Sequence, residues 1–370
     1  MKKTMYCVNK NGSIQQWSVD AFMKEVVVTY GKLGGTMRSK STYCKGKNIG
    51  KKNETSPEDQ AIKEVLSKVN KQKDKYYRET IEEAEELLTE GVMLAQDYSK
   101  KPHLLEDEFY VSPKLDGLRV KTTFVLGEPV WHSRGGKTYP VPSHLIPELK
   151  ALNEAGYSVL DGEGYIHSTK LQKIQSCIKK TNELTPQVTY QIFDIPVLNK
   201  TWNTRLAMLN SLSSVIAQDR GKFKSVAVVD QMKCTKENLD GMLDYYLRLG
   251  FEGVMMRNLR GEYLFQNKRS NNLLKYKIMF DSECKVLSCV EDKNNQGLFT
   301  VEWTNPDDGV TVQFSLSMNG AQEENSYSKL AQRIGEYVNF KYQDLTEDGV
   351  PTFARGLYFR ECDYKGEPLE

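Results

Sequence analysis

Six consecutive residues, Lys114-Leu115-Asp116-Gly117-Leu118-Arg119, bring two cations and an acid together around a glycine. A lysine amine is a nucleophile only when it is deprotonated, and its ordinary pKa is about 10.4. Neighbouring cations or partial burial lower that pKa, and the same cations can hold phosphate. The glycine permits a tight turn or a close approach of the backbone. The segment therefore indicates a nucleophilic lysine beside a phosphate, although an ordinary turn with an ion pair has the same composition.

Three later segments place polar or aromatic residues at the ends of apolar stretches. Trp131–Lys137 carries Arg134, Leu160–Glu163 ends in Asp-Gly-Glu, and Tyr190–Asp194 contains Phe193. Each has a plain alternative: a basic hairpin turn, a common turn at a strand end, and a core phenylalanine in an apolar strand. None of the three decides the function alone.

Two further segments are richer in charge. Glu252–Arg257 has the pattern E-G-x-x-x-R, and Leu273–Lys277 carries Lys275 and Lys277 two positions apart. Side chains alternate between the faces of a strand, so we expect both amines to project from one face. Such a pair usually lies on a solvated face, but here it closes a series of charged segments.

In this order, the six segments resemble the motifs of the covalent nucleotidyltransferases, the superfamily of DNA ligases, RNA ligases and mRNA capping enzymes. Lys114–Arg119 matches the K-x-D-G-x-R signature, and the others match the S-R-x-G, D-G-E, aromatic, E-G-x-x-x-R and lysine-pair elements. The resemblance implies an α+β core of two sheets, similar to the ATP-grasp fold. It also implies that Lys114 attacks the α-phosphate of ATP, expels pyrophosphate and carries AMP.

The resemblance assigns a role to each matching residue. Asp116 and Arg119 join Lys114 in the catalytic set, and Glu163 and Glu252 are the expected ligands of Mg²⁺, which Mn²⁺ can replace. The expected nucleotide ligands are Lys114, Arg119, Arg134, Glu163, Phe193, Lys275 and Lys277. AMP would then pass to the 5′-phosphate of nicked double-stranded DNA, and the adjacent 3′-hydroxyl would displace it and seal the strand.

One departure concerns the nucleotide base. Many ligases place a glutamate two residues before the nucleophile to read adenine, whereas this chain has Ser112 there, followed by Pro113. Proline stiffens the strand end and has no amide donor. The expectation of ATP therefore rests on the overall resemblance and not on an identified contact with the base.

The chain of 370 residues is long enough for two or three domains. Short strands are expected at Met5–Val8, Ile14–Val19, Glu25–Tyr30 and Thr36–Cys44, followed by a helix that starts at Ser56. A solvated connecting helix is expected over Lys71–Glu90. The expected domains are then 1–75, 76–280 and 281–370. In the second we expect strands and amphipathic helices such as Thr169–Lys180 and Asn238–Leu249. In the third we expect a small barrel with one helix around Ser326–Ile334.

The flanking domains carry resemblances of their own. Residues 281–370 resemble the oligonucleotide-binding (OB-fold) barrel of DNA ligases, where Arg355 or Arg360 would orient the pyrophosphate of ATP. Residues 1–75 form a mainly-β segment similar to a Trp-Gly-Arg (WGR) domain of certain bacteriophage ligases, although the triplet at Tyr30-Gly31-Lys32 departs at two positions. Residues 1–80 contain 17 Lys and Arg against 8 Asp and Glu, a net charge of +9, whereas the remainder has 34 against 41. This asymmetry agrees with DNA binding by the N-terminal domain, and a solvated lysine-rich face is the alternative.

Composition excludes several other classes. Seven scattered cysteines and four lone histidines favour neither a zinc site nor a disulfide framework, and no apolar run could span a membrane. The lack of a membrane-spanning run leads us to expect the cytoplasm, and the resemblance to DNA ligases implies a monomer that acts in DNA replication, repair or recombination. Four other functions stay open. A capping guanylyltransferase shares the core motifs, and a DNA-binding protein with a decayed site is a non-enzymatic alternative. An RNA ligase is disfavoured by the expected barrel, and an NAD-dependent ligase is disfavoured because zinc-binding cysteines are missing.

Overall fold

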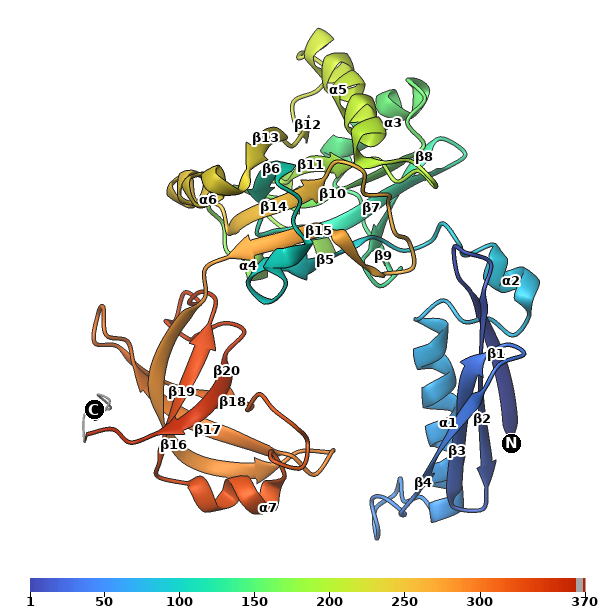
Figure 1. Cartoon of the computed structure of the whole chain (residues 1–370), viewed down its shortest axis with the longest axis vertical. Helices are drawn as coiled ribbons and strands as arrows, with labels where there is room; N and C mark the ends of the chain where they lie inside the picture. The colour runs from blue at the N-terminus through green and yellow to red at the C-terminus, as the bar shows by residue number, and fades with distance from the viewer. Residues whose placement is uncertain (364–368, 370) are drawn as a thin grey trace. The chain divides into compact units, whose positions relative to one another are not determined.

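The computed structural model describes residues 1–363 and 369 and divides the chain into two units, Met1–Tyr276 and Lys277–Glu370. Figure 1 shows the order of the elements along the chain. Mixed α and β structure runs through the first unit, and the second is built mainly from strands. Among the described residues, no helix has the length and apolar character needed to cross a membrane.

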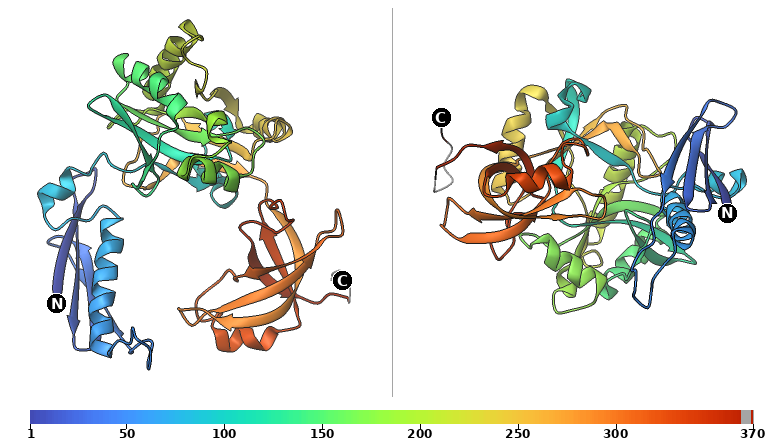
Figure 2. Two further views of the ribbon diagram at one scale, coloured as in Figure 1. Left: turned by 180° about the vertical axis from the view of Figure 1, so that it is seen from behind. Right: turned by 90° about the horizontal axis from the view of Figure 1, so that it is seen from below.

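Residues 1–75 form an antiparallel sheet covered by one helix. Its strands are β1 (Lys2–Val8), β2 (Ile14–Phe22), β3 (Glu25–Lys32) and β4 (Met37–Tyr43), paired in sequence order. Helix α1 (Pro57–Lys73) starts where the sequence predicts, because the Ser56 side chain accepts a hydrogen bond from the Asp59 amide. Figure 2 shows α1 along one face of the sheet, where Val65 and Trp17 share a small core.

The predicted connecting helix over Lys71–Glu90 is wrong. α1 ends at Lys73, because Tyr76 adopts a left-handed conformation with φ of 66° and the Tyr77 amide donates back to the Gln72 carbonyl. This pattern of hydrogen bonds terminates a helix. A separate short helix, α2 (Ile81–Glu85), follows, and its first turn is capped by Thr80.

The rest of the first unit contains two sheets. The six-stranded sheet has the order β12 (Val226–Val228), β11 (Thr189–Asp194), β10 (Val159–Tyr165), β7 (Leu118–Val125), β8 (Glu128–Ser133) and β9 (Thr138–Tyr139). The five-stranded sheet has the order β13 (Met232–Thr235), β6 (Glu108–Lys114), β14 (Gly253–Asn258), β15 (Arg269–Lys277) and β5 (Leu94–Asp97). The chain passes from one sheet to the other twice, after β6 and after β12, so residues distant in sequence meet between them.

Helices bury the outer apolar faces of these sheets. The largest core joins the six-stranded sheet to α3 (Ile146–Glu154), α4 (Leu171–Lys179) and α5 (Trp202–Gln218). A second core joins the five-stranded sheet to α6 (Leu239–Arg248). Both α4 and α6 lie where amphipathic spacing predicts helices. Short 3-10 turns occupy Tyr98–Lys100, Pro102–Leu104, Ser143–Leu145, Thr185–Gln187 and Lys236–Asn238.

The second unit is a curled sheet around its own core. β16 (Phe280–Glu291), β17 (Gly297–Thr304) and β18 (Thr311–Leu316) form a meander, and β19 (Tyr337–Tyr342) pairs with β16 while β20 (Arg355–Arg360) pairs with β19. An isolated parallel bridge between Met318 and Gly356 links the segment after β18 to β20. α7 (Tyr327–Leu330) and a 3-10 turn at Ala331–Arg333 connect β18 to β19.

Candidate active site

The nucleophile predicted from the sequence lies where the chain leaves one sheet for the other. Lys114 is the last residue of β6, and β7 in the other sheet begins four residues later. The antiparallel register pairs Lys114 with Gly253, and the Glu252 amide donates to the Lys114 carbonyl at 3.0 Å. Backbone pairing thus brings Glu252 beside Lys114, and their side chains form an ion pair that is largely buried. This pairing explains why two motifs 138 residues apart meet at one point.

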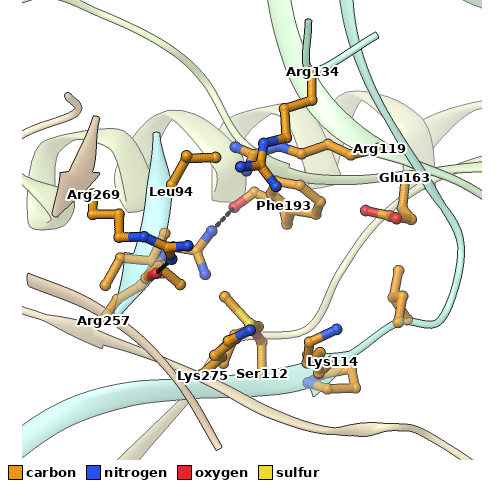
Figure 3. Close-up of a pocket in the computed structure, with 15 residues that line it drawn as sticks. Leu94, Ser112, Lys114, Arg119, Arg134, Glu163, Phe193, Arg257, Arg269 and Lys275 are labelled. Carbon is orange, nitrogen blue, oxygen red and sulfur yellow. Dashed lines mark hydrogen bonds between the residues drawn. The ribbon is translucent and has the colours of Figure 1, made fainter. Parts of the chain in front are cut away.

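Between the two sheets lies a cavity of about 270 Å³. Figure 3 shows Lys114 and Glu163 on one side of it, Arg257 and Arg269 on the other, and Phe193 between them. Its walls come from β6, β14, β15 and β5 in one sheet and from β7, β10, β11 and the turn after β8 in the other. The lining residues are Leu94, Ala95, Ser112, Pro113, Lys114, Leu115, Arg119, Arg134, Glu163, Phe193, Met255, Arg257, Arg269, Leu273 and Lys275.

Cations dominate the polar lining of this cavity. Among the described residues, six cationic side chains and one carboxyl, that of Glu163, face it. Burial, and next the charges of Arg269 and Arg119, lower the pKa of the Arg134 guanidinium. Such crowding of positive charge is costly without an anion, so the cavity suits a polyphosphate with an apolar or aromatic body.

The carboxyl that faces the cavity is held tightly in place. A Cβ atom at Gly117 would lie 2.6 Å from the Glu163 Cγ and 2.7 Å from the Gly164 carbonyl oxygen. Glycine is therefore required for the segment just before β7 to pass so close to β10. Burial raises the pKa of Glu163 to about 8, although Lys114 and Arg119 act to lower it. Because burial disfavours the ionised carboxylate of Glu163, a further cation beside it would stabilise that form.

Arg119 is fixed by a buried network behind the cavity. Its Nε and Nη2 donate to the two oxygens of Asp161 at 3.0 and 2.5 Å, and its Nη1 donates to the Met93 carbonyl at 2.6 Å. The Tyr263 hydroxyl also donates to Asp161, at 2.6 Å. Burial opposes the charge of Arg119, but Asp161 raises the pKa of the guanidinium above its ordinary value. The arginine is therefore held charged and in one orientation.

Phe193 lines the cavity and is only partly buried. The guanidinium carbons of Arg119 and Arg257 lie 5.3 and 5.7 Å from its ring centroid. Along β11 the burial alternates, and Phe193 shares its less buried face with Gln191. An aromatic surface flanked by cations can stack a planar base and hold it against phosphate-binding groups.

The cavity does not gather all of the predicted site residues. Lys114, Arg119, Arg134, Glu163, Phe193 and Lys275 line it, and Glu252 is paired with Lys114. Asp116 lies in the crossing between β6 and β7 but not in the lining.

Lys277 and the two arginines expected in a C-terminal barrel, Arg355 and Arg360, are not among the residues that line the cavity. Lys277 donates to the Gln343 side chain and lies 5.7 Å from the Phe353 ring centroid. Both contacts are within the second unit. Arg360 donates to Glu283 at 3.1 Å, and Arg355 begins β20.

Sequence reasoning missed two arginines that line the cavity. Arg257 ends the predicted E-G-x-x-x-R element, and Arg269 lies on the same strand as Lys275. The motif already contained Arg257, so that residue was available as a candidate, whereas nothing in the local pattern marked Arg269. The described residues contain no group of three or more His, Cys, Asp or Glu that could hold a metal ion.

Known proteins match this chain along most of its length. The ATP dependent DNA ligase domain matches residues 92–277, which is half of the chain. The DNA ligase of African swine fever virus (isolate Tick/South Africa/Pretoriuskop Pr4/1996) is 26% identical over 356 residues, covering 88% of this chain and 81% of the relative. The DNA ligase of Haemophilus influenzae is 24% identical over 281 residues, covering 73% and 91%.

A solved structure of a Lig E DNA ligase has a TM-score of 0.57 at 26% identity and covers 73% of this chain and 99% of its own. A second structure, Pmar-Lig_Pre, has a TM-score of 0.64 at 21% identity, covers 83% of this chain and 72% of its own, and supports the fold alone. The matched domain spans the two sheets and the cavity between them. The chain therefore belongs to the family of ATP-dependent DNA ligases.

Proposed function

We propose that this protein seals nicks in duplex DNA through a covalent Lys114–AMP intermediate. The observation that carries the proposal is the position of Lys114, which lies at the edge of a cation-lined cavity and pairs with Glu252. The lysine nitrogen attacks the α-phosphorus of ATP, a P–N bond forms, and the P–O bond to the β-phosphate breaks. Pyrophosphate leaves, and the nearest described acceptor for the amine proton is the Glu252 carboxylate.

The next two steps use the same phosphorus chemistry. An oxygen of the 5′-phosphate at the nick attacks the AMP phosphorus, the P–N bond breaks, and the amine regains its proton. The 3′-hydroxyl then attacks the 5′-phosphorus and expels AMP. Arg119 and Lys275 supply fixed positive charge beside the reacting phosphoryl group, while Phe193 holds the base. We assign Asp116 and Lys277, which lie outside the cavity lining, to these two later steps.

The carboxyls suit a divalent cation. Mg²⁺ binds one or two carboxylates together with phosphate oxygens, and the proposed ligands are Glu163 and Glu252. Burial raises the pKa of Glu163 to about 8 even though Lys114 and Arg119 act to lower it, so a bound cation would favour its carboxylate form. When bound, the ion would neutralise charge on the transferring phosphoryl group, and Mn²⁺ can replace it.

We also assign the flanking domains. The strand order β18-β17-β16-β19-β20, the helix between β18 and β19 and the parallel bridge at Gly356 support an OB-fold barrel that binds the duplex. The sheet of residues 1–75, with its net positive charge, is proposed as a WGR-like module that grips DNA phosphates. The protein is proposed to act as a monomer in the cytoplasm of its cell, in replication, repair or recombination.

The decisive experiment is intact-mass measurement after mixing the protein with ATP and Mg²⁺. The expected result is the mass of one AMP on Lys114, which disappears on addition of nicked duplex while sealed strand appears. Lys114→Ala should gain no AMP, with an unchanged circular dichroism spectrum as the control for folding. An adduct that persists in Lys114→Ala would place the nucleophile elsewhere.

Two parallel assays separate the other members of the superfamily. Labelled GTP in place of ATP should leave the protein unlabelled, whereas a capping enzyme would take up GMP. Nicks with RNA on either side should be sealed more slowly than nicks in DNA. Faster sealing of RNA would assign the protein to the RNA ligases.

A further inference from the structure

The N-terminal sheet contacts the larger part of the first unit at the corner between β1 and β2, residues 8–10. The Val8 carbonyl, at the end of β1, accepts a hydrogen bond from the Gln266 side chain at 3.1 Å. The Asn9 side chain accepts one from the Lys268 amine at 2.9 Å. Val8 and Gln266 are only 3% and 8% exposed, so this contact is buried.

An ion pair extends the same contact. Lys10, the next residue of the corner, pairs with Glu262, and the two side chains are 35% and 42% exposed. Such an exposed pair contributes little to stability by itself. Together with the two hydrogen bonds, however, it means that the corner holds the segment 262–268 at its first and last residues.

The backbone of the segment 262–268 needs this support. Gln266 and Asn267 both adopt the left-handed conformation, with φ of 59° and 55°. Two such residues in succession are unfavourable for side chains with a Cβ atom, and they persist only where their surroundings hold them. The Gln266 amide donates to the Glu90 carbonyl at 2.6 Å, and the Asn267 side chain accepts from the Val92 amide at 3.1 Å. The corner adds a further contact, through the buried side chain of Gln266.

The same segment leads to the active site at both of its ends. Its second residue is Tyr263, whose hydroxyl donates to Asp161, the partner of Arg119. Its last residue, Lys268, is followed directly by Arg269, which begins β15 and lines the cavity. Residues that contact the corner are therefore next in sequence to the residues that hold or supply positive charge in the cavity.

We propose that the β1–β2 corner is a positioning element for adenylylation of Lys114. By holding the segment 262–268, it keeps Arg119 and Arg269 in the orientation that receives the phosphates of ATP. The inference rests on the proposed nucleotidyl transfer and deepens it. The N-terminal sheet thus has a part in the first chemical step, which needs no DNA, in addition to its proposed grip on DNA phosphates. Residues 8–10 touch no reacting atom and act through the segment.

The test measures single-turnover adenylylation of the full chain by labelled ATP and Mg²⁺, without DNA. At saturating ATP the rate constant reports the reaction of folded molecules, whereas the amplitude reports the fraction that is folded. Lys10→Glu places an acid against Glu262 and should lower the rate constant at least about threefold, because small displacements of site groups slow the chemistry. Asn9→Ala, which removes an acceptor without changing charge, should lower it as well.

A charge swap and a matched control complete the test. Lys10→Glu combined with Glu262→Lys restores the ion pair in reverse, and its rate constant should return to within about twofold of the wild-type value. Lys3→Glu is the control, because Lys3 lies on β1 of the same sheet but pairs with Glu79, at 3.3 Å. This variant makes the same change in net charge and should keep the wild-type rate constant.

Three results would overturn the proposal: a wild-type rate constant in Lys10→Glu, equal slowing in Lys3→Glu, or a charge swap that stays as slow as Lys10→Glu. Failure of the wild-type protein to take up AMP from ATP at all would instead contradict the proposed function.

Discussion

At the scale of single residues, Gly117 connects the local backbone to the chemistry. Gly117→Ala should lower the adenylylation rate at least about tenfold, because the new methyl group meets the Gly164 carbonyl and pushes Glu163 away. Single-turnover kinetics with labelled ATP measure this decrease. Gly241→Ala is the control, since beyond its chain neighbours and the backbone of its own helix no described atom lies within 4 Å of its Cβ position in α6, and it should stabilise the fold by about 0.5–1 kcal/mol. An unchanged rate in Gly117→Ala would mean that β7 and Glu163 adjust freely.

Glu163 also predicts a pH dependence of stability without metal and nucleotide. Its pKa is raised to about 8 in the folded protein, against about 4.3 for an unfolded glutamate, so the folded state binds the proton more tightly. This contribution to the free energy of unfolding is present in full below about pH 4 and is lost as the pH rises towards 8. Urea titrations between about pH 5 and 9 should therefore give a steeper decline for the wild-type protein than for Glu163→Gln. Parallel curves would contradict the raised pKa.

At the scale of elements, the buried network around Asp161 joins the six-stranded sheet to the segment before β15. The Tyr263 hydroxyl donates to Asp161 at 2.6 Å and accepts from the Met93 amide at 3.2 Å. Tyr263→Phe should reduce the free energy of unfolding by about 1–3 kcal/mol, because it leaves buried partners unsatisfied. Urea denaturation measures this change. Tyr358→Phe, at a half-exposed tyrosine of β20, should change it by less than about 0.5 kcal/mol.

Local elements were predictable where the chain carries its own start and stop signals. Ser56 and Pro57 marked the start of α1, and amphipathic spacing marked α4 and α6. The helix predicted over Lys71–Glu90 failed because a left-handed residue, Tyr76, interrupts a charged stretch whose composition alone suits a helix. A non-glycine residue in that conformation is stabilised by its surroundings, which composition does not encode.

The site residues also divide into those that the local sequence predicted and those that only the pairing of distant strands reveals. Motif order supplied Lys114, Glu163 and Phe193, and all three line one cavity. The pairing of β6 with β14 decided which further residues join them, and that register depends on strands far apart in sequence. Lys277 follows Lys275 by two positions and is the last residue of β15, and its amine bonds to Gln343 in the second unit, a contact that the local sequence did not indicate.

At the scale of the whole molecule, the uneven charge predicts how DNA binding responds to salt. Removing one cation that neutralises a DNA phosphate lowers the slope of log affinity against log salt by about one. Arg38 and Lys40 lie on β4, which is exposed along its whole length. Changing both to glutamine should reduce that slope by up to about two for nicked duplex and leave adenylylation of Lys114 unchanged.

Lys222→Gln with Lys224→Gln is the control for this prediction. These two lysines are also exposed but follow α5 in the first unit, outside residues 1–75. Fluorescence anisotropy at several salt concentrations measures both slopes. An equal reduction of the slope in the two variants would show that the N-terminal sheet has no special share in DNA binding.

The crossing of the chain at Lys114 has a consequence for motion. Whatever occupies the cavity touches both sheets at once, and once joined to Lys114 it is attached to the single segment that links β6 to β7. Loading with AMP should therefore slow amide hydrogen exchange in β11 and β14 together, although these strands belong to different sheets. The protein that carries AMP on Lys114 would then be more rigid than the protein without it. Transfer of AMP to the 5′-phosphate at a nick would make both sheets more mobile again.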